Sequence, residues 1–256
     1  MCYTDDARPP LPRISGAAAD QGEIHLNSAD GNPFLAYFAR AGRPTGAGIV
    51  IMPDVRGLHD FYKELAQRFA ETGVDAVAID YFGRTAADDA RDEGFDFRAH
   101  LKDLEPSGIS ADVLAAVEYL RSEEMGSPGA VFTVGFCFGG AQSWRQSAAG
   151  HGLAGCIGFY GRPEAAREVL GGMRAPLLLL VAGADFTPLD EFQRFDRELA
   201  AGAVPHRMVI YPGAPHSFFD RTFAEHREAC DDAWEQMLGF IRDEGGSAGS
   251  TATDNR

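Results

Sequence analysis

The chain has 256 residues, and its 45% hydrophobic content is enough for one sizeable core in a single α/β domain. Its formal net charge of −15 argues against non-specific nucleic-acid binding, which depends on neutralising phosphates. The longest apolar stretches reach about six to nine residues, against the roughly 20 that a membrane-spanning helix needs. The N-terminus is acidic and lacks the apolar core of a signal peptide. We therefore expect a cytoplasmic protein with neither nucleic acid nor membrane as a partner.

The two ends of the chain differ in composition from the rest. Residues 1–20 are rich in proline and small residues, and we expect them to form an extended arm. The segment from Gly245 to Arg256 is rich in Gly, Ser, Thr and Asp, which predicts a disordered tail. Residues 21–244 show no internal repeat and no second compositional domain, so one domain is expected between the ends.

The interior begins with a hairpin pattern and then alternates strands with helices. Glu23–Asn27 and Pro33–Ala39 flank Asp30-Gly31, which is typical of a β-hairpin. Short apolar runs predict the strands that follow, and 3.6-residue periodicity predicts the helices. The expected strands are Gly48–Met52, Val74–Ile79, Ala130–Val134, Leu153–Phe159, Leu177–Val181 and Arg207–Tyr211. The expected helices contain Phe61, Leu65 and Phe69, or span Ile109–Leu120, Gly140–Ala149, Leu189–Leu199 and about Phe223–Ile241.

This alternation predicts the fold class. Repeated strand–helix units indicate a mostly parallel sheet with helices on both faces, and the leading hairpin adds antiparallel strands at one edge. In such sheets the reactive groups gather at the carboxyl ends of the strands. Candidate catalytic residues are therefore sought in the loops that follow each strand.

The loop after the strand Ala130–Val134 carries the strongest motif. Gly135-Phe136-Cys137-Phe138-Gly139 is G-x-C-x-G, the nucleophile-elbow pattern with Cys in place of Ser. The glycines two residues before and after Cys137 let strand and helix approach closely, and the helix N-terminus favours a thiolate. The alternative is that Cys137 is a small buried hydrophobe, which is how we interpret Cys156 and Cys230.

An acid and a base follow later strands in the order that this architecture requires. Asp185 lies at the carboxyl end of Leu177–Val181, whereas its rival Asp190 is interpreted as the N-cap of the next helix. His216 lies between the last strand and the last helix. We expect His216 to take the thiol proton while Asp185 holds its tautomer. His59 is a weaker candidate for lining the pocket.

An enzyme of this kind also needs two backbone N–H donors for the developing oxyanion. One is expected from Phe138, the residue after the nucleophile. The other is expected from Val55, in the loop that follows the strand ending at Met52. The four cysteines (Cys2, Cys137, Cys156 and Cys230) form no C-x-x-C pair, and no compact ligand spacing such as H-E-x-x-H is present. We therefore expect reduced thiols and no metal.

Over roughly residues 20–242 the sequence resembles the dienelactone hydrolase (carboxymethylenebutenolidase) family of α/β-hydrolases. The resemblance implies the α/β-hydrolase fold, and hydrolysis of a lactone or ester through a thioester acyl-enzyme at Cys137 without a cofactor. The residues that carry it are Pro53-Asp54-Val55-Arg56-Gly57-Leu58, Asp80-Tyr81-Phe82-Gly83-Arg84, Gly135-Phe136-Cys137-Phe138-Gly139-Gly140, Gly183-Ala184-Asp185 and His216-Ser217-Phe218.

The resemblance also implies further site residues. A carboxylate in the position of Asp54 contacts the resting thiol in the family and helps control its ionisation; well-known members have glutamate there. The alternative for Asp54 is a loop cap bonded to nearby N–H groups. Family members that cleave dienelactone hold the substrate carboxylate with arginines. The candidates here are Arg56, Arg84, Arg98 and Arg221.

The leading hypothesis is therefore a cysteine hydrolase whose partner is a small-molecule ester or lactone, acting as a monomer or weak homodimer. The altered stretch Phe219-Asp220-Arg221 after the histidine motif leaves the substrate itself open. The alternative is a non-catalytic ligand-binding or redox-responsive relative, in which the thiol of Cys137 is oxidised reversibly.

Overall fold

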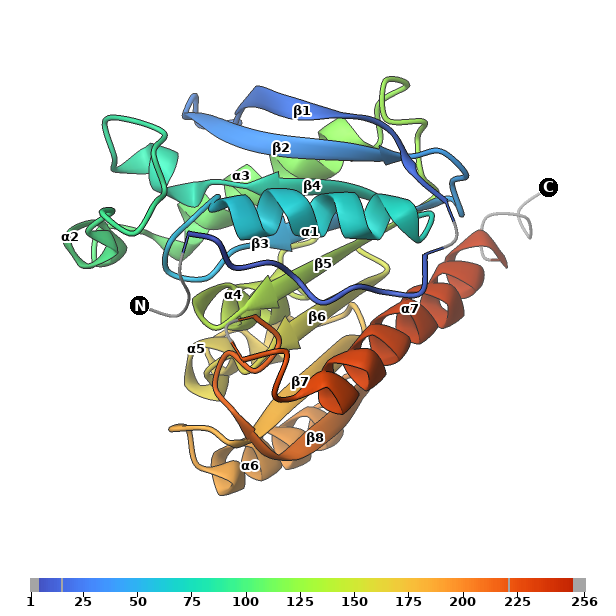
Figure 1. Ribbon diagram of the computed structural model, residues 1–256. Coiled ribbons are helices and arrows are strands. Elements are labelled where there is room, and N and C mark those ends of the chain that lie inside the picture. Colours follow the sequence, from blue (N-terminus) through green and yellow to red (C-terminus); the bar gives the residue numbers. More distant parts are fainter. Residues whose placement is uncertain (1–4, 15, 221, 251–256) are drawn as a thin grey trace.

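A computed structural model describes residues 5–14, 16–220 and 222–250 of the chain, and only the backbone of 247–250. Eight strands form one sheet in the order β1-β2-β4-β3-β5-β6-β7-β8, with helices on both faces (Figure 1). The β2–β4 pairing is antiparallel, and every pairing from β4 through β8 is parallel. The predicted fold class is thus confirmed. The strands are β1 Ala18–Asn27, β2 Pro33–Ala41, β3 Ala47–Met52, β4 Asp75–Ile79, β5 Ala130–Phe136, β6 Gly155–Phe159, β7 Leu177–Ala184 and β8 His206–Pro215.

The predicted hairpin is formed by β1 and β2 at one edge of the sheet. Their register pairs Asn27 with Pro33, and the turn between them closes through the Ser28 N–H, which donates to the carbonyl of Asn32. Gly31 adopts a φ of 85°, a left-handed conformation that glycine reaches without steric cost. The turn of the hairpin lies beyond the carboxyl end of β4, since Ala36 pairs with Ile79 and Asp30 pairs with Arg84. The hairpin closes this edge of the sheet.

The helices include four short segments that the sequence patterns did not predict, because one turn is too short for a periodic signal. These are α2, α5 and the 3₁₀ turns η1 and η2. Pro188, not Asp190, is the N-cap of α6, so that expectation was wrong; Asp190 lies in the first turn, where its charge suits the helix dipole. The segments are α1 Asp60–Glu71, η1 Tyr81–Arg84, α2 Phe97–Leu101, α3 Pro106–Leu120, α4 Phe138–Gln146, α5 Pro163–Arg167, η2 Leu170–Gly172, α6 Leu189–Ala201 and α7 Arg227–Ser250.

The last helix begins later and ends later than its apolar pattern indicated. It continues past Ile241 through Gly245 to Ser250, so the first residues of the expected tail are helical. Helical periodicity ends where the last apolar side chain reaches the core, whereas the backbone hydrogen bonds continue beyond it. Residues 251–256 of that tail lie outside the described residues.

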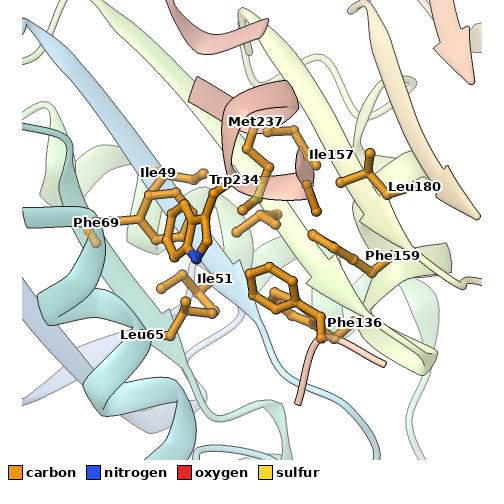
Figure 2. Close-up of a cluster of buried hydrophobic side chains, with 14 of the residues drawn as sticks. Ile49, Ile51, Leu65, Phe69, Phe136, Ile157, Phe159, Leu180, Trp234 and Met237 are labelled. Atoms are coloured by element: carbon orange, nitrogen blue, oxygen red, sulfur yellow. The ribbon is translucent and has the colours of Figure 1, made fainter. Parts of the chain in front are cut away.

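One face of the sheet is covered by α1 and α7. Apolar side chains from both helices meet side chains of β3, β5, β6 and β7 in one buried cluster (Figure 2). Within it, the rings of Phe69 on α1 and Trp234 on α7 are 4.9 Å apart, and Phe136 stacks on Phe159 at 4.8 Å. Phe136 directly precedes Cys137, so this packing holds the end of β5 in a fixed position.

The opposite face is covered by α3, α4 and α6. Val113 and Val117 on α3 pack against Val50 and Val77 of the sheet. Trp144 on α4 packs with apolar side chains of β6, β7 and α6. Within the described residues, no helix combines the length and the apolar character that a membrane span requires.

The N-terminal arm runs in an extended path across the face covered by α1 and α7 (Figure 1). Trp234 donates its indole N–H to the carbonyl of Pro10 at 3.0 Å, and Arg8 pairs with Glu64 at 3.1 Å. Farther toward the N-terminus, Asp5 Oδ1 lies 3.2 Å from Nε2 of His59. The arm therefore connects the last helix to the loop that follows β3.

Candidate active site

The end of β5 forms a sharp turn at Cys137. Cys137 has φ 55° and ψ −114°, a strained conformation for any residue with a side chain, and it is the N-cap of α4. Its N–H donates to the carbonyl of Phe159 on the neighbouring strand at 3.1 Å. The thiol is half-buried, as an accessible nucleophile requires. The turn thus presents one side chain at the carboxyl end of the sheet.

The glycines beside Cys137 are required by close backbone contacts. A Cβ on Gly135 would overlap the carbonyl of Gly139. A Cβ on Gly139 would overlap the carbonyl oxygens of Met52 and Pro53. The first turn of α4 therefore lies directly against the loop that follows β3.

Asp185 and His216 meet at the ends of β7 and β8. Nδ1 of His216 lies 2.8 Å from Oδ2 of Asp185, whose side chain is fully buried. The other carboxylate oxygen accepts the N–H of Thr187 at 3.1 Å, which fixes the carboxylate. Nε2 of His216 has no hydrogen-bond partner among the described residues. With Nδ1–H held by Asp185, Nε2 is the nitrogen that can accept a proton.

Tyr160 lies between the elbow and the histidine. It follows β6, whose Phe159 pairs in register with Phe136 of β5 and with Leu180 of β7. Its ring lies 4.8 Å from the ring of His216. Burial raises the pKa of its phenol well above the usual range, and the charges of Asp220 and Cys137 add to this rise. Tyr160 thus stays neutral, packs on the candidate base His216 and responds to the charge of Cys137.

Two backbone amides are available at the predicted oxyanion positions. The N–H groups of Val55 and Phe138 have no acceptor among the described residues. Phe138 is the first residue of α4, where the N–H has no partner within the helix. Because α4 packs on the carbonyls of Met52 and Pro53, both amides border the same elbow.

Two buried tyrosines hold the backbone of the loop that carries Val55. Tyr62 accepts the N–H of Asp54 at 2.9 Å, and the Tyr81 hydroxyl donates to the carbonyls of Pro53 and Asp54. Burial raises the pKa of Tyr81 well above its usual range, and the charges of Asp54 and Cys137 raise it further. Tyr81 therefore remains a donor, which keeps the loop in place.

This geometry agrees with the comparison to known proteins. Residues 34–245 match the model of the Dienelactone hydrolase family. The chain belongs to that family. As a dienelactone hydrolase family member it is a carboxylic ester or lactone hydrolase, and its predicted resemblance is confirmed.

The alignments with relatives of this family member span most of both chains. Proteins named "Putative carboxymethylenebutenolidase" from Salmonella typhi and Escherichia coli (strain K12) are each 25% identical to it. They align over 237 and 234 residues, covering 86% and 85% of this chain and 87% and 85% of their own.

Solved structures share the fold. A dienelactone hydrolase-like promiscuous phosphotriesterase from metagenomic libraries has a TM-score of 0.72 at 23% identity, covering 89% of this chain and 99% of its own. The dienelactone hydrolase of Anabaena variabilis has a TM-score of 0.68 at 16% identity, covering 88% and 97%. Brefeldin A esterase has a TM-score of 0.71 at 17% identity, covering 95% and 81%.

Asp54, the predicted thiol-modulating carboxylate, is buried beside Arg56. Its Oδ1 accepts the N–H of Arg56 at 3.0 Å, which is the loop-capping arrangement considered as the alternative role. Nε of Arg56 lies 3.7 Å from the same oxygen, and both side chains are buried. Asp54 also acts electrostatically on Tyr81 and Tyr160, the two phenols that the charge of Cys137 affects. The charges of Asp54 and Cys137 thus act on the same two phenols.

The structure describes two of the other predicted arginines, Arg84 and Arg98, and both make contacts away from the elbow. Arg84 pairs with Asp112 and Asp30, each at 2.8 Å, so its guanidinium is already engaged. Arg98 is exposed on α2 with its guanidinium over the ring of Phe97. Arg221 lies outside the described residues.

His59 has a structural role instead of lining the pocket. Its Nδ1 accepts the N–H of Phe61 at 3.2 Å as the N-cap of α1, while Nε2 faces Asp5. Burial lowers its pKa, and Asp5 opposes this effect. The imidazole therefore connects the arm to the start of α1 and to the loop before it.

Tyr160 and Arg91 were missed by the sequence reasoning, and Asp80 was noted only as part of a family motif. Tyr160 follows a strand, a position that could have marked it. Asp80 and Arg91 form a buried ion pair at 2.8 Å, and Asp80 also accepts the N–H of Leu58 in the loop that follows β3. Arg91 lies in an irregular segment, where no periodic pattern could have indicated burial.

The two other described cysteines are unsuited to nucleophilic chemistry. Cys156 and Cys230 are both fully buried, and burial raises the pKa of each thiol to about 12. Cys2 lies outside the described residues. Among the described cysteines, Cys137 is thus the one that solvent and substrate can reach.

Proposed function

We propose that Cys137 is the nucleophile of this hydrolase and that the reaction passes through a covalent thioester. The observation that supports this is the acid–base pair of Asp185 and His216, whose unpartnered Nε2 lies at the same end of the sheet as the cysteine elbow. The assignment rests on the arrangement of these three residues, which follow the parallel strands β5, β7 and β8.

The acylation step follows from their chemistry. His216 removes the proton from the thiol, and the sulfur attacks the carbonyl carbon of the ester or lactone. The N–H groups of Val55 and Phe138 stabilise the oxyanion that forms. As the carbon–oxygen bond breaks, His216 gives the proton to the departing alkoxide. The alcohol leaves, or stays attached in a lactone, and the acyl group remains on Cys137.

Deacylation reverses these roles. His216 takes a proton from water, the resulting hydroxide attacks the thioester carbonyl, and the carboxylic acid is released as the thiol is reprotonated. Asp185 keeps the imidazole in the tautomer with the proton on Nδ1 and stabilises the imidazolium. The negative charge of Asp54 helps to control the ionisation of the Cys137 thiol.

The test is to trap the acyl-enzyme. Acid quenching during turnover of 4-nitrophenyl acetate, followed by peptide mass analysis, is expected to show acetyl on the peptide that contains Cys137. Cys137→Ala should lower kcat by about 10³-fold or more. Cys230→Ala is the matched control, because its thiol is buried and should be neither acylated nor required. Turnover by Cys137→Ala at the wild-type rate would reject the assignment.

The redox-responsive alternative has a separate signature. It predicts no turnover of any ester or lactone in a broad panel, together with reversible peroxide oxidation of Cys137. A reactive thiol must be reduced to act as a nucleophile, and for this reason we propose a cytoplasmic location.

A further inference from the structure

The candidate base His216 is held by a hydrogen bond at one of its two ring nitrogens. Its Nδ1 lies 2.8 Å from Oδ2 of Asp185, whereas Nε2 has no hydrogen-bond partner among the described residues. One hydrogen bond leaves the imidazole free to rotate about that contact, and such a rotation would move Nε2. The groups packed on the imidazole therefore decide where Nε2 points.

One of these groups is the buried ring of Tyr160. Its centre lies 4.8 Å from the centre of the His216 ring. Tyr160 is itself fixed at both ends, because its N–H donates to the carbonyl of Leu180 at 2.9 Å and its hydroxyl donates to Oδ2 of Asp220 at 3.4 Å. Tyr160 thus supports the imidazole from the protein interior.

A second group is Phe186, whose ring lies closer to the imidazole, at 4.3 Å between ring centres. This side chain is 61% exposed, and the other large apolar side chains with such exposure in the described part of the chain are Leu11 and Ile14 of the N-terminal arm. The side chain of His216 itself is 14% exposed. An exposed ring packed on a largely covered imidazole indicates that Phe186 covers the base from the solvent side.

The carboxylate of Asp185 helps to place Phe186 in this position. Its Oδ1 accepts the N–H of Thr187 at 3.1 Å, which closes a turn around Phe186, while its Oδ2 faces Nδ1 of His216. One buried carboxylate thus acts on both the base and the ring packed on it. The guanidinium carbon of Arg162 lies 5.5 Å from the centre of the Phe186 ring, a cation–π contact that further restrains the ring.

Resting on the proposed function, we infer that Phe186 is a positioning residue for His216. Together with Tyr160 it restricts rotation of the imidazole about the hydrogen bond to Asp185. Nε2 then stays where it can take the thiol proton of Cys137 and pass it to the departing alkoxide. Displacement of a catalytic group by about 1 Å can reduce the rate about 10²-fold, so removal of the exposed ring should act on kcat.

Steady-state turnover of 4-nitrophenyl acetate tests this. Phe186→Ala should lower kcat about 5- to 30-fold and change KM by less than about twofold, since His216 serves both acylation and deacylation. Phe186→Tyr keeps a ring on the imidazole and should hold kcat within about threefold of wild type. Leu11→Ala is the matched control, because it removes an equally exposed large apolar side chain from the arm and should have wild-type kinetics.

The same change in a His216→Ala background shows whether Phe186 acts through the base. Without the imidazole the ring has nothing to position, so adding Phe186→Ala should change the residual rate by less than about twofold. An equal loss of rate in both backgrounds would mean that the ring contacts the substrate or supports the fold in general. That result would overturn the positioning role.

The outcomes separate this inference from the proposed function. If Cys137→Ala is inactive and Phe186→Ala turns over the ester at the wild-type rate, the positioning role is rejected and the nucleophile stands. A loss of kcat in Phe186→Tyr as large as in Phe186→Ala also rejects it, because an aromatic ring would then be insufficient. If Cys137→Ala turns over the ester at the wild-type rate, the proposed function fails, and a role for Phe186 in that reaction fails with it.

Discussion

Gly139 lies so close to Met52 that a side chain on the glycine would overlap the methionine's carbonyl oxygen. Met52 ends β3 and Gly139 lies in the first turn of α4, so this contact joins the turn at Cys137 to the loop that carries Val55. The separation of the two candidate oxyanion donors depends on it. The glycine is therefore a spacing element of the site.

Gly139→Ala should therefore lower both activity and stability. The added methyl group meets backbone atoms of Met52 and Pro53, which cannot rotate away as a side chain could. Overpacking of this kind costs about 1–3 kcal/mol of unfolding free energy, and a displacement of about 1 Å between catalytic groups can reduce kcat about 10²-fold. Urea unfolding and steady-state kinetics measure the two effects. Gly129→Ala is the control, since a Cβ there meets nothing within 4 Å; equal behaviour of the two variants would refute the spacing role.

Asp185→Asn should lower kcat without unfolding the protein. An asparagine amide in place of the carboxylate no longer selects the Nδ1–H tautomer of His216 or stabilises its cation. By analogy with the serine-protease triad, we expect a loss of about 10³- to 10⁴-fold in kcat at neutral pH. Asp190→Asn, an exposed change on the first turn of α6, should have wild-type kinetics. A loss in Asp190→Asn instead would reverse the assignment of the acid.

Arg91→Met should destabilise the fold by leaving Asp80 buried without its partner. Burial raises the pKa of Asp80, and Arg91 opposes that rise through the ion pair. Breaking a buried pair from one side costs about 3–5 kcal/mol of unfolding free energy. The double variant Asp80→Asn with Arg91→Met should lose less unfolding free energy than Arg91→Met alone, because neither charge of the pair remains. Arg98→Met, on the exposed side of α2, should change stability by less than about 0.5 kcal/mol. If Arg91→Met were as stable as wild type, the ion pair would not be needed for stability.

The stability of the protein should fall on mild acidification, in part through His59. Burial lowers the pKa of His59 in the folded protein, so between that value and the unfolded value of about 6.5 the unfolded chain binds more protons. The free energy of unfolding therefore decreases as pH falls below about 6.5, by at most about 1.4 kcal/mol per pH unit for one proton. Protonation of Nδ1 would also remove the acceptor for the Phe61 N–H.

His59→Asn separates this contribution from others. Asparagine can still cap α1 but does not titrate, so the difference between pH 5.5 and pH 7.5 in urea unfolding should be smaller than in wild type. His151, whose pKa is also lowered by burial, keeps its own slope of the same sign in both proteins. An unchanged pH dependence in His59→Asn would exclude His59 as a source.

Local pattern was enough to predict most of the fold and the main chemical groups. Strand and helix periods depend on neighbours within a few residues, and the alternation of the two admits few topologies. The G-x-C-x-G elbow is a local motif for the same reason. Asp185 and His216 were found because each follows a predicted strand, and carboxyl ends of parallel strands share one edge of the sheet.

The tertiary structure alone decided how the charged side chains are used. Arg84 was a candidate for binding a substrate carboxylate, but it pairs with Asp30 and Asp112. Arg91 pairs with Asp80, eleven residues before it. Arg162, which no motif marked, forms no ion pair with a described residue, and its guanidinium lies over the ring of Phe186. Long charged side chains can pair with residues that are distant in sequence. Because a buried charge is costly unless it is paired, the partner depends on which groups the packed structure brings together. The sequence therefore determined where the candidate nucleophile, acid and base lie along the chain, whereas only the three-dimensional packing decided which arginines are paired with carboxylates.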